Sequence, residues 1–488
     1  MKNKKWFVSI VIMLLILVAF TTACSDSTGV DTGEGDNGDE QVTLKMFMAA
    51  GQFSKGNFGY NQVQEFMEAN PNIKVEITRA PPGDQWLNSF YALASSDDLP
   101  DIIQPPNQLF FPDMVQNEWI QPLDGLVSSD FKERFPEETF IEGYNMIDGE
   151  IYSFPRILPK RGDVLQYNKD IMEQAGLDPN QPPKTWDELL SMSKTITEKV
   201  DGVYGFTADL KDPNGYQMFI GMSNPLHPTV SIEGFDYKEG RYAFDDPGII
   251  EGFEFLLELK DAGVIHPNSL TFGGQDAQGA FANKQVAFYV FVDSAVRINE
   301  KELGGVEDYD ITTLPVPEEG MTFHQINSPH SYISSYISST TEHPEAAGKL
   351  IDWLSSEDYF QKQLEDGMLL SPISKQNETA DSEQLQSLAK ALEDSLINFP
   401  NPQLKNGGLE VKSIEGSLAK PQPDWWQIIQ GAYVGEIEDW KAELKKVNDI
   451  YNDRFDKAMK QAQEEGADVS REDFQFPDFE GDQNYSHE

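Results

Sequence analysis

The chain has 488 residues and one cysteine, and it carries a formal net charge of −45 at pH 7 from 37 basic and 82 acidic side chains. This excess of negative charge repels the phosphate backbones of DNA and RNA, which argues against a nucleic-acid partner. The hydrophobic fraction of 39% is that of a folded protein, and the length exceeds what one hydrophobic core usually supports, so we expect two lobes or domains.

Residues 1–23 have the pattern of a secretory signal peptide. Three of the first five residues are lysines, residues 6–20 form an apolar run broken only by Ser9, and small residues follow up to Ala23. This order of a basic start, a short apolar core and small residues predicts a cleaved export signal. The run is too short for a transmembrane helix, which needs about 20 apolar residues.

Cys24 directly follows this signal. The arrangement resembles the bacterial lipoprotein box, in which the cysteine is lipidated and becomes the mature N-terminus, although Thr21 stands where that box usually has an aliphatic residue. The resemblance implies a lipid anchor at Cys24, with more than one acyl chain for stable membrane attachment. Ordinary secretion with a free cysteine is the alternative. Residues 24–40 are polar and acidic apart from Val30, which predicts a flexible tether.

The body begins with alternating strand and helix patterns. Alternating apolar residues predict strands over Val42–Met48 and residues 73–77, and apolar residues at helical spacing predict helices over Tyr60–Glu68 and Trp86–Ala94. A third strand is predicted to begin at Asp101–Ile103. This βαβαβ order predicts an α/β fold that starts as a doubly wound sheet, with a ligand crevice at the carboxyl ends of its strands.

Further elements follow along the chain. Strands are predicted over Val286–Val292 and Ser331–Ser338, and helices over Trp186–Thr197, Ile249–Asp261, Pro344–Ser355 and from Trp425 through Met459. The tail from Gln461 is acidic and poor in aliphatic residues. It is predicted to be a loosely packed extension, in which Phe474, Phe476 and Phe479 are candidate anchors.

Signatures of catalysis and of metal binding are missing from the sequence. It has no GxSxG elbow, no Walker loop and no GxGxxG loop, and no two of its six histidines are spaced as HxxH or HxxxH. With 82 acidic residues, a carboxylate pair for glycoside hydrolysis can always be nominated, so such a pair carries no information. We therefore expect a protein that is not an enzyme and that needs no cofactor and no metal ion.

An ordered series of short motifs runs through the chain. It comprises DLPDII at residues 98–103, DGEIYSFP at 148–155, YNKD at 167–170, AGL at 175–177, PKTWDEL at 183–189, FANKQVAF at 281–288, HPEAA at 343–347 and WL at 353–354. The series resembles the extracellular solute-binding proteins of family 1, the maltose-binding-type receptors of ABC sugar importers. One departure is Lys284, which stands where that family usually has glycine. Within the series, Thr185 and Glu188 have the spacing of a helix capping box.

The resemblance implies a two-lobe, Venus-flytrap-like fold with a hinge, in which the ligand lies between the lobes and favours the closed form. The first lobe would comprise residues 41–158 and 312–367, the second lobe residues 159–311 and 368–463, and residues 464–488 would form the acidic C-terminal extension. The chain would cross between the lobes near Leu158–Asp163, Thr312–Pro315 and Gly367–Ser371.

The resemblance also implies which positions contact the ligand. They are Gln52, Phe53, Asn107, Gln108, Arg161, Asp163, Asp293, Ser294, Trp425 and Trp426, and the candidates His330 and Tyr332 precede the returning strand. Sugars pack an apolar face on aromatic rings and bond their hydroxyls to carboxylates and amides, so one of the two tryptophans is expected to stack on a sugar and Asp293 to accept a hydroxyl. Loop capping is the structural alternative for the polar residues. Residues 198–204, where some relatives carry a calcium loop, lack the alternating oxygen ligands that calcium needs.

The sequence thus predicts a monomeric lipoprotein on the extracellular side of the cell membrane that binds a carbohydrate and delivers it to ABC permease subunits. Two alternatives remain open. One is a surface glycoside hydrolase or lyase, and the other is a peptide or adhesion receptor on a similar fold.

Overall fold

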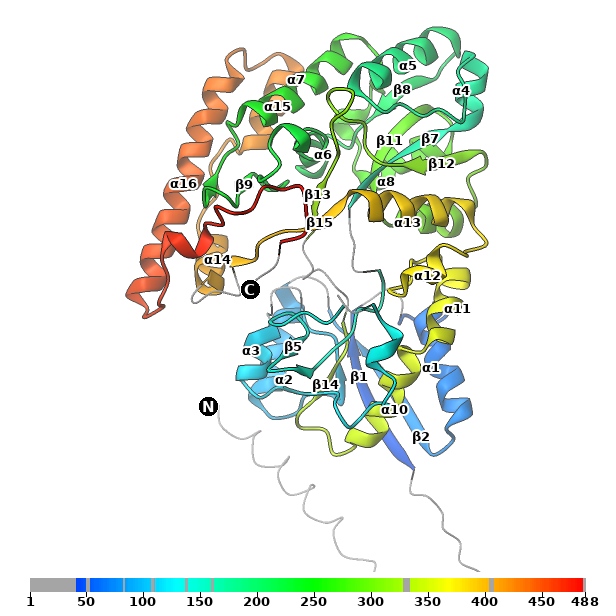
Figure 1. Cartoon of the computed structure of the whole chain (residues 1–488), viewed down its shortest axis with the longest axis vertical. Helices are drawn as coiled ribbons and strands as arrows, with labels where there is room; N and C mark the ends of the chain where they lie inside the picture. Colours follow the sequence, from blue (N-terminus) through cyan, green and yellow to red (C-terminus); the bar gives the residue numbers. More distant parts are fainter. Residues whose placement is uncertain are drawn as a thin grey trace, which may run out of the picture. The chain divides into compact units, whose positions relative to one another are not determined.

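A computed structural model describes residues 41–49, 53–81, 84–106, 109, 111–136, 139–158, 162–327, 334–402 and 408–485. The predicted signal peptide, Cys24 and the predicted tether lie outside these residues. Gln41–Glu488 forms one compact unit, and Figure 1 shows that it consists of two lobes, each built around its own sheet. No helix in the described ranges is long and apolar enough to cross a membrane.

The first lobe contains a five-stranded sheet with the order β2-β1-β3-β14-β4. β1 pairs in parallel with β2 and β3, whereas β14 is antiparallel to β3 and β4. The predicted βαβαβ order is confirmed. The elements of this lobe are β1 Val42–Met48, α1 Phe58–Ala69, β2 Ile73–Arg79, α2 Asp84–Ser95, β3 Ile102–Ile103, α3 Phe111–Gln116, β4 Ile120–Gln121, β5 Met146–Ile147, β6 Glu150–Ile151, β14 Tyr336–Ser338, α10 Pro344–Leu354 and α11 Glu357–Gly367.

Neighbouring residues of β1 enter two different cores. Leu44, Met46 and Met48 belong to a core that includes side chains of α1, α10 and α11. Phe47 belongs to a second core with side chains of α2 and α3. Because successive side chains of a strand point to opposite faces, the sheet is covered by helices on both sides.

The second lobe contains a four-stranded sheet with the order β12-β7-β11-β8. β11 is antiparallel to β7 and parallel to β8, and the predicted strand Val286–Val292 is confirmed at both ends. The elements of this lobe are β7 Asp163–Asn168, α4 Lys169–Ala175, α5 Trp186–Lys199, β8 Tyr204–Thr207, α6 Asn214–Met222, β9 Phe235–Asp236, β10 Arg241–Tyr242, α7 Pro247–Asp261, α8 Gly274–Ala282, β11 Val286–Val292, α9 Ala295–Arg297, β12 Tyr309–Thr312, β13 Gln325–Asn327, α12 Ser374–Asn377, α13 Glu383–Ser395, β15 Leu396–Asn398, α14 Gly408–Ser417, α15 Trp425–Val434 and α16 Trp440–Glu464.

Local signals set the ends of two helices in this lobe. The predicted capping box of α5 is confirmed: the Glu188 N–H donates to Thr185 Oγ1 at 3.2 Å, and the Thr185 N–H donates to Glu188 Oε2 at 3.3 Å. The single helix expected from Trp425 through Met459 is wrong, because the chain forms α15 and α16 instead. Gly435 ends α15 in the left-handed conformation, with φ +81°, which glycine adopts without strain.

The chain segments between the two sheets differ in part from the prediction. The Leu158 N–H donates to the Leu370 carbonyl at 2.9 Å, so two of the predicted crossings lie side by side. The Trp186 N–H donates to the Val316 carbonyl, and Gln325 Nε2 donates to the Asp163 carbonyl at 2.6 Å. These bonds hold Val316 and Gln325 to the second lobe, whereas the boundary expected at residue 312 assigned them to the first.

The C-terminal tail is packed, so the expectation of a loose extension is wrong. Phe474, Phe476 and Phe479 are each at most 2% exposed. The Phe476 N–H donates to the Tyr237 carbonyl at 2.9 Å, and the Tyr485 N–H donates to the Asn398 carbonyl at 2.8 Å. Buried rings and backbone hydrogen bonds therefore replace the aliphatic side chains that the tail lacks.

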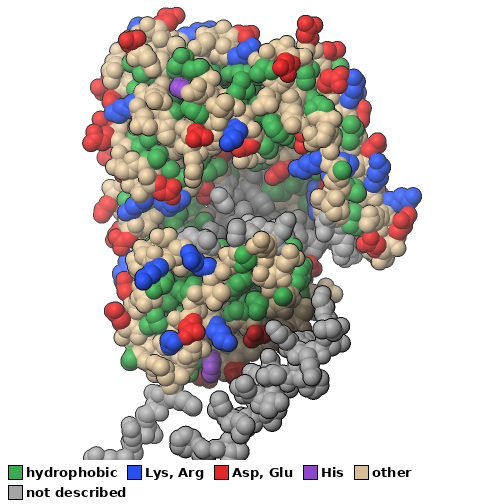
Figure 2. All heavy atoms as spheres, turned by 180° about the vertical axis from the view of Figure 1, so that it is seen from behind, with side chains coloured by type: hydrophobic (Ala, Val, Ile, Leu, Met, Phe, Trp, Pro, Cys, Tyr) green, Lys and Arg blue, Asp and Glu red, His purple; other side chains and the backbone are tan. Residues whose placement is uncertain are grey.

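Charged side chains are interspersed over the surface. Figure 2 shows Asp and Glu scattered over one face with Lys and Arg among them, rather than in one acidic patch. Several exposed bases are paired, such as Lys441 with Glu254 and Lys390 with Asp394. Exposed pairs of this kind each contribute little to stability. Most of the charged side chains therefore form a solvated surface rather than a stabilising network.

Candidate functional site

Three carboxylates lie together where strands of the second-lobe sheet begin or end. We call this end of the sheet the acidic end. Asp163 begins β7, Asp293 directly follows β11, and Asp209 follows β8 by two residues. β7 is antiparallel to β11 and pairs Asp163 with Val292, while β11 is parallel to β8. This pairing brings the start of β7 and the ends of β8 and β11 to the same edge. The predicted ligand contacts Asp163 and Asp293 are therefore brought together, and Asp209 joins them.

Burial and mutual repulsion shift the titration of these carboxylates. Burial, and then the negative charge of Asp293, raises the pKa of Asp163 to about 6. Burial is also the main reason that the pKa of Asp209 rises to about 7; a backbone hydrogen bond opposes the rise, and the charges of Asp212 and Asp163 add to it. The acidic end is suited to accept hydrogen bonds from hydroxyls and to repel anions. Within the described ranges, no group of three acidic, histidine or cysteine side chains could hold a metal ion.

Phe53, a predicted ligand contact in the first lobe, is buried. Its ring is 2% exposed, and the guanidinium carbon of Arg156 lies 4.9 Å from the ring centroid. Arg156 Nη2 also donates to Gln104 Oε1 at 3.0 Å, and burial lowers the pKa of Arg156 to about 10. Phe53 is thus part of the packing beneath the loops, and its role as a ligand contact stays a prediction.

The other predicted contacts divide into two groups. Ser294 is half-buried and directly precedes α9 beside Asp293. The remaining ones lie outside the described residues, and their roles stay predictions: Gln52, Asn107, Gln108, Arg161, His330 and Tyr332.

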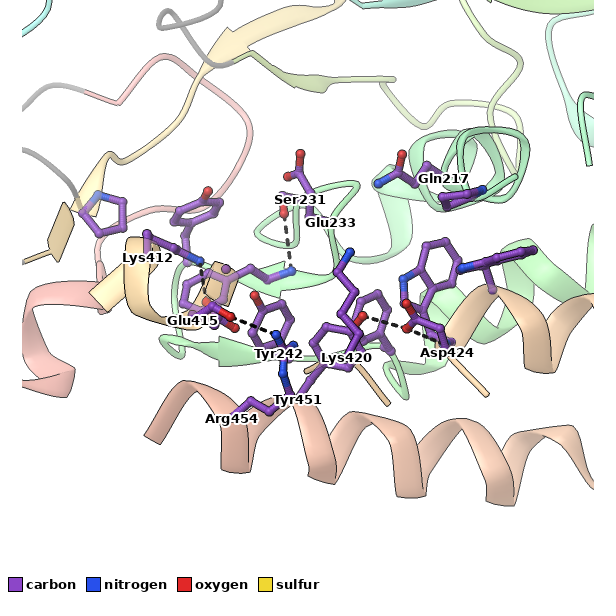
Figure 3. Close-up of a pocket in the computed structure, with 18 of the residues that line it drawn as sticks. Gln217, Ser231, Glu233, Tyr242, Lys412, Glu415, Lys420, Asp424, Tyr451 and Arg454 are labelled. Atoms are coloured by element: carbon purple, nitrogen blue, oxygen red, sulfur yellow. Dashed lines mark hydrogen bonds and ion pairs between the residues drawn. The ribbon is translucent and has the colours of Figure 1, made fainter. Parts of the chain in front are cut away.

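A pocket of about 450 Å³ lies in the second lobe, and we call it the aromatic pocket. Its walls come from α6, from the β9–β10 hairpin, from the segment around residue 400 and from α14 to α16 (Figure 3). Aromatic rings dominate these walls, among them Tyr237, Tyr242, Phe244, Phe399, Trp425 and Trp426. The size and the mixture of rings with a few polar groups are typical of a small-molecule site.

Both predicted tryptophans line the aromatic pocket, but their surroundings differ. Trp425 is 5% exposed and stacks with Phe244, at 5.2 Å between centroids and 16° between planes. It also stacks with Phe253, at 6.1 Å and 24°. Trp426 is half-buried, and its ring lies 6.1 Å from that of Tyr216. Trp425 is therefore mainly a core residue, and Trp426 has more ring surface available for a ligand.

A buried network of charges supports one side of the aromatic pocket. Lys412 Nζ lies 4.6 Å from the centroid of Phe235 and 3.6 Å from Glu415 Oε2. Arg454 Nη2 donates to the Glu415 carbonyl at 2.9 Å. Glu415 and Arg454 are 5% and 6% exposed. Lys412 pairs with Glu415, and Arg454 donates to backbone carbonyls, but Glu415 Oε1 and Arg454 Nε are buried without a hydrogen-bond partner among the described residues, so the network is only partly satisfied.

Three further polar residues, Gln217, Glu233 and Lys420, line the aromatic pocket and lie outside this buried network. Figure 3 shows the ammonium group of Lys420 directed towards the side of the pocket where Glu233 and Gln217 lie. Lys420 and Glu233 are exposed, and neither forms an ion pair with another described residue. They offer one donor and one acceptor to a ligand, with no net charge between them.

Sequence patterns do not reveal this pocket as a whole. Its residues come from several separate segments between residues 213 and 454, and none of these segments forms a recognisable motif. The one local signal is the aromatic density of the β9–β10 hairpin, where residues 235–244 include Phe235, Tyr237, Tyr242 and Phe244. Aromatic rings of a hairpin can belong to a core or to a site, so this signal needs the fold to interpret it.

Two α/β lobes that are linked by crossing segments define a two-lobe ligand-binding protein. The family model for the bacterial extracellular solute-binding proteins matches residues 50–359, more than half of the chain. The chain belongs to this family, which confirms the resemblance seen in its motifs.

Similar proteins agree with this assignment. A binding protein of Brucella abortus (strain 2308) is 25% identical over 370 residues, which cover 74% of this chain and 79% of that protein. The sn-glycerol-3-phosphate-binding periplasmic protein UgpB of the same strain is 26% identical over 191 residues, which cover 38% of this chain and 42% of that protein. An ABC transporter solute-binding protein of Thermotoga lettingae TMO, solved with bound α-D-tagatose, has a TM-score of 0.60 at 19% identity and covers 85% of this chain and 100% of its own. The last similarity shows the two-lobe α/β fold.

Proposed function

We propose that this protein binds a neutral carbohydrate, delivers it to an ABC permease and does not transform it. The observation that carries the proposal is the aromatic pocket of about 450 Å³, in which rings alternate with a few polar groups. Sugars present an apolar ring face and a rim of hydroxyls, and this pocket offers partners for both. The α-D-tagatose in the similar Thermotoga lettingae protein is a ligand of this chemical class.

Charge favours a neutral sugar over a phosphorylated one. The relative UgpB is named for sn-glycerol-3-phosphate, whose phosphate is an anion. Here Asp163, Asp209 and Asp293 repel anions at the acidic end, and Lys420 in the aromatic pocket is balanced by Glu233. A ligand that carries hydroxyls but no charge meets acceptors without repulsion.

The N-terminal sequence supports a position at the cell surface. A signal-like stretch over residues 1–23, followed by Cys24 and a polar segment, supports export and lipid anchoring on the extracellular side. An anchored binding protein stays close to a permease in the same membrane. We propose that it acts there as a monomer.

Thermal-shift screening tests the proposal. The Cys24→Ser protein is heated with neutral mono- and oligosaccharides and with glycerol-3-phosphate. We expect a neutral sugar at 100 times its Kd to stabilise the fold by about 2.7 kcal/mol, because it binds only the folded state. Stabilisation by glycerol-3-phosphate alone would contradict the proposal. Chromatography of the incubated sugars tests the enzyme alternative, for which the expected result is unchanged oligosaccharides.

A further inference from the structure

We propose that Gln325 is a positioning residue for lobe closure: its side chain joins two of the segments that cross between the lobes, and it thereby fixes where the hinge ends in the second lobe. This role rests on the two-lobe fold and does not depend on which ligand is bound. It goes beyond the proposed function, because neither Gln325 nor Gly162, which makes room for its amide, is a predicted ligand contact.

The Gln325 amide pairs with the backbone of Asp163, the first residue of β7. The Asp163 N–H donates to Gln325 Oε1, and Gln325 Nε2 donates to the Asp163 carbonyl, both at 2.6 Å. One side chain thus satisfies both backbone groups of one residue, as the opposite residue of an antiparallel strand does. Gln325 is 8% exposed, so water competes little for these bonds.

Gly162 allows the amide to come this close. A Cβ atom on Gly162 would lie 2.9 Å from Gln325 Oε1, and 3.0 Å from both Gln325 Nε2 and Leu396 Cδ2. These distances are shorter than a side chain tolerates, so the amide reaches Asp163 because residue 162 has no Cβ atom. The contact can therefore be disturbed from its other side, by Gly162→Ala, with every hydrogen-bonding group left in place.

The backbone that carries Gln325 is held within the second lobe. Each residue of β13 pairs in parallel with a residue of β15. The C-terminal tail holds the end of β15, since the Asn398 N–H donates to Asn484 Oδ1 and the Tyr485 N–H donates to the Asn398 carbonyl, both at 2.8 Å. Gln325 therefore connects Asp163 to a support that β15 and the tail fix in place.

The same two crossing segments also meet at their first-lobe ends. Pro155 forms an antiparallel bridge with Ser334. Beside it a second buried glutamine, Gln363 of α11, donates from Nε2 to the Arg156 carbonyl at 2.8 Å. The first crossing is thus held by a glutamine side chain at each end. Hinge closure is absorbed by a few backbone dihedral angles, and these two contacts confine the change to the residues between them.

Loss of the Gln325 contact should extend the hinge into β7 and let the lobes take up a wider range of orientations. Single-molecule energy transfer between two dyes on the unliganded protein measures this range. Cys24→Ser removes the only cysteine, and Glu68→Cys on α1 and Lys194→Cys on α5 supply one exposed labelling site in each lobe.

We expect Gln325→Met to broaden the distribution of interlobe distances, because methionine fills about the same space without an N–H donor. Hydrogen exchange of the Asp163 amide should become about fivefold faster or more, as for the loss of one hydrogen bond. Gly162→Ala should broaden the distribution in the same way, and it tests the contact even if Gln325→Met lowers stability. Gln463→Met, which removes a 2.7 Å hydrogen bond to the Val469 carbonyl, is the matched control and should follow the wild type.

The double variant decides whether the two changes act on one contact. Gly162→Ala combined with Gln325→Met should broaden the distribution no further than either change alone. Wild-type distributions in both single variants, or fully additive effects in the double variant, would overturn the positioning role. Failure of the wild-type protein to bind any neutral sugar would contradict the proposed function instead, and it leaves these measurements unaffected because they are made without ligand.

Discussion

Asp209 should make the protein less stable as the pH rises, and this effect can be isolated. Its pKa is raised from 3.8 to about 7, mainly because its side chain is buried, at 9% exposure for the residue. A pKa that is higher in the folded state contributes stability that is complete below about pH 4 and is lost as the pH rises through about 7. The difference of about 3 pKa units corresponds to about 4 kcal/mol between these limits.

The assay is thermal unfolding from pH 4.5 to pH 8.5 for the wild type and Asp209→Asn. The asparagine cannot ionise, so this variant should gain up to about 4 kcal/mol on the wild type at pH 8 and little at pH 4.5. With an unfolding entropy of roughly 1 kcal/mol/K for a body of this length, the gain is roughly 4 °C in Tm. Asp201→Asn, at an exposed position, serves as the control and should follow the wild type. Parallel curves for Asp209→Asn and the wild type would refute the burial argument.

Three further predictions follow from the packing and from the N-terminus. Trp425→Ala should lower the free energy of unfolding by about 3–5 kcal/mol in a denaturant titration, since it empties a site stacked on Phe244; an unchanged midpoint would show that the ring is not core. Gly435→Ala should cost about 1–2 kcal/mol by the same measurement, because φ is +81° there, and a stabilised variant would contradict this. Cys24→Ser should move the protein from washed membranes into the medium on an immunoblot; retention on the membrane would place the anchor elsewhere.

Short-range periodicity was enough to predict some of the regular elements. The strand Val286–Val292 and the capping box at Thr185 depend only on neighbours within a few residues, and both are confirmed. The break at Gly435 was missed because the apolar pattern continues on both sides of it, while the stop depends on one backbone conformation. Phe474 was predicted as a candidate anchor of the tail and is buried, but its partner Phe455 could not be predicted, because the two rings meet only after the chain folds back onto α16.

The site could be predicted only in part, for a related reason. Adjacent tryptophans at the start of a helix imply that one of them faces the core, but periodicity cannot say which one. The structure buries Trp425 and leaves Trp426 half-buried, because Phe244 and Phe253 of distant segments occupy the space beside Trp425. Asp209 was not foreseen, because its place beside Asp163 follows from the pairing of strands that are far apart in the chain.

Family membership and ligand choice depend on different parts of this chain. The family model covers residues 50–359, which include the four-stranded sheet of the second lobe and every strand of the first-lobe sheet except β1. The aromatic pocket takes one wall from residues 213–244 and the other from residues 399–454, beyond the end of that match. The second wall therefore lies outside the range that defines the family. Phe399, Lys420 and Trp426 all belong to this second wall, so the choice among sugars should be decided there, and the family assignment alone does not predict it.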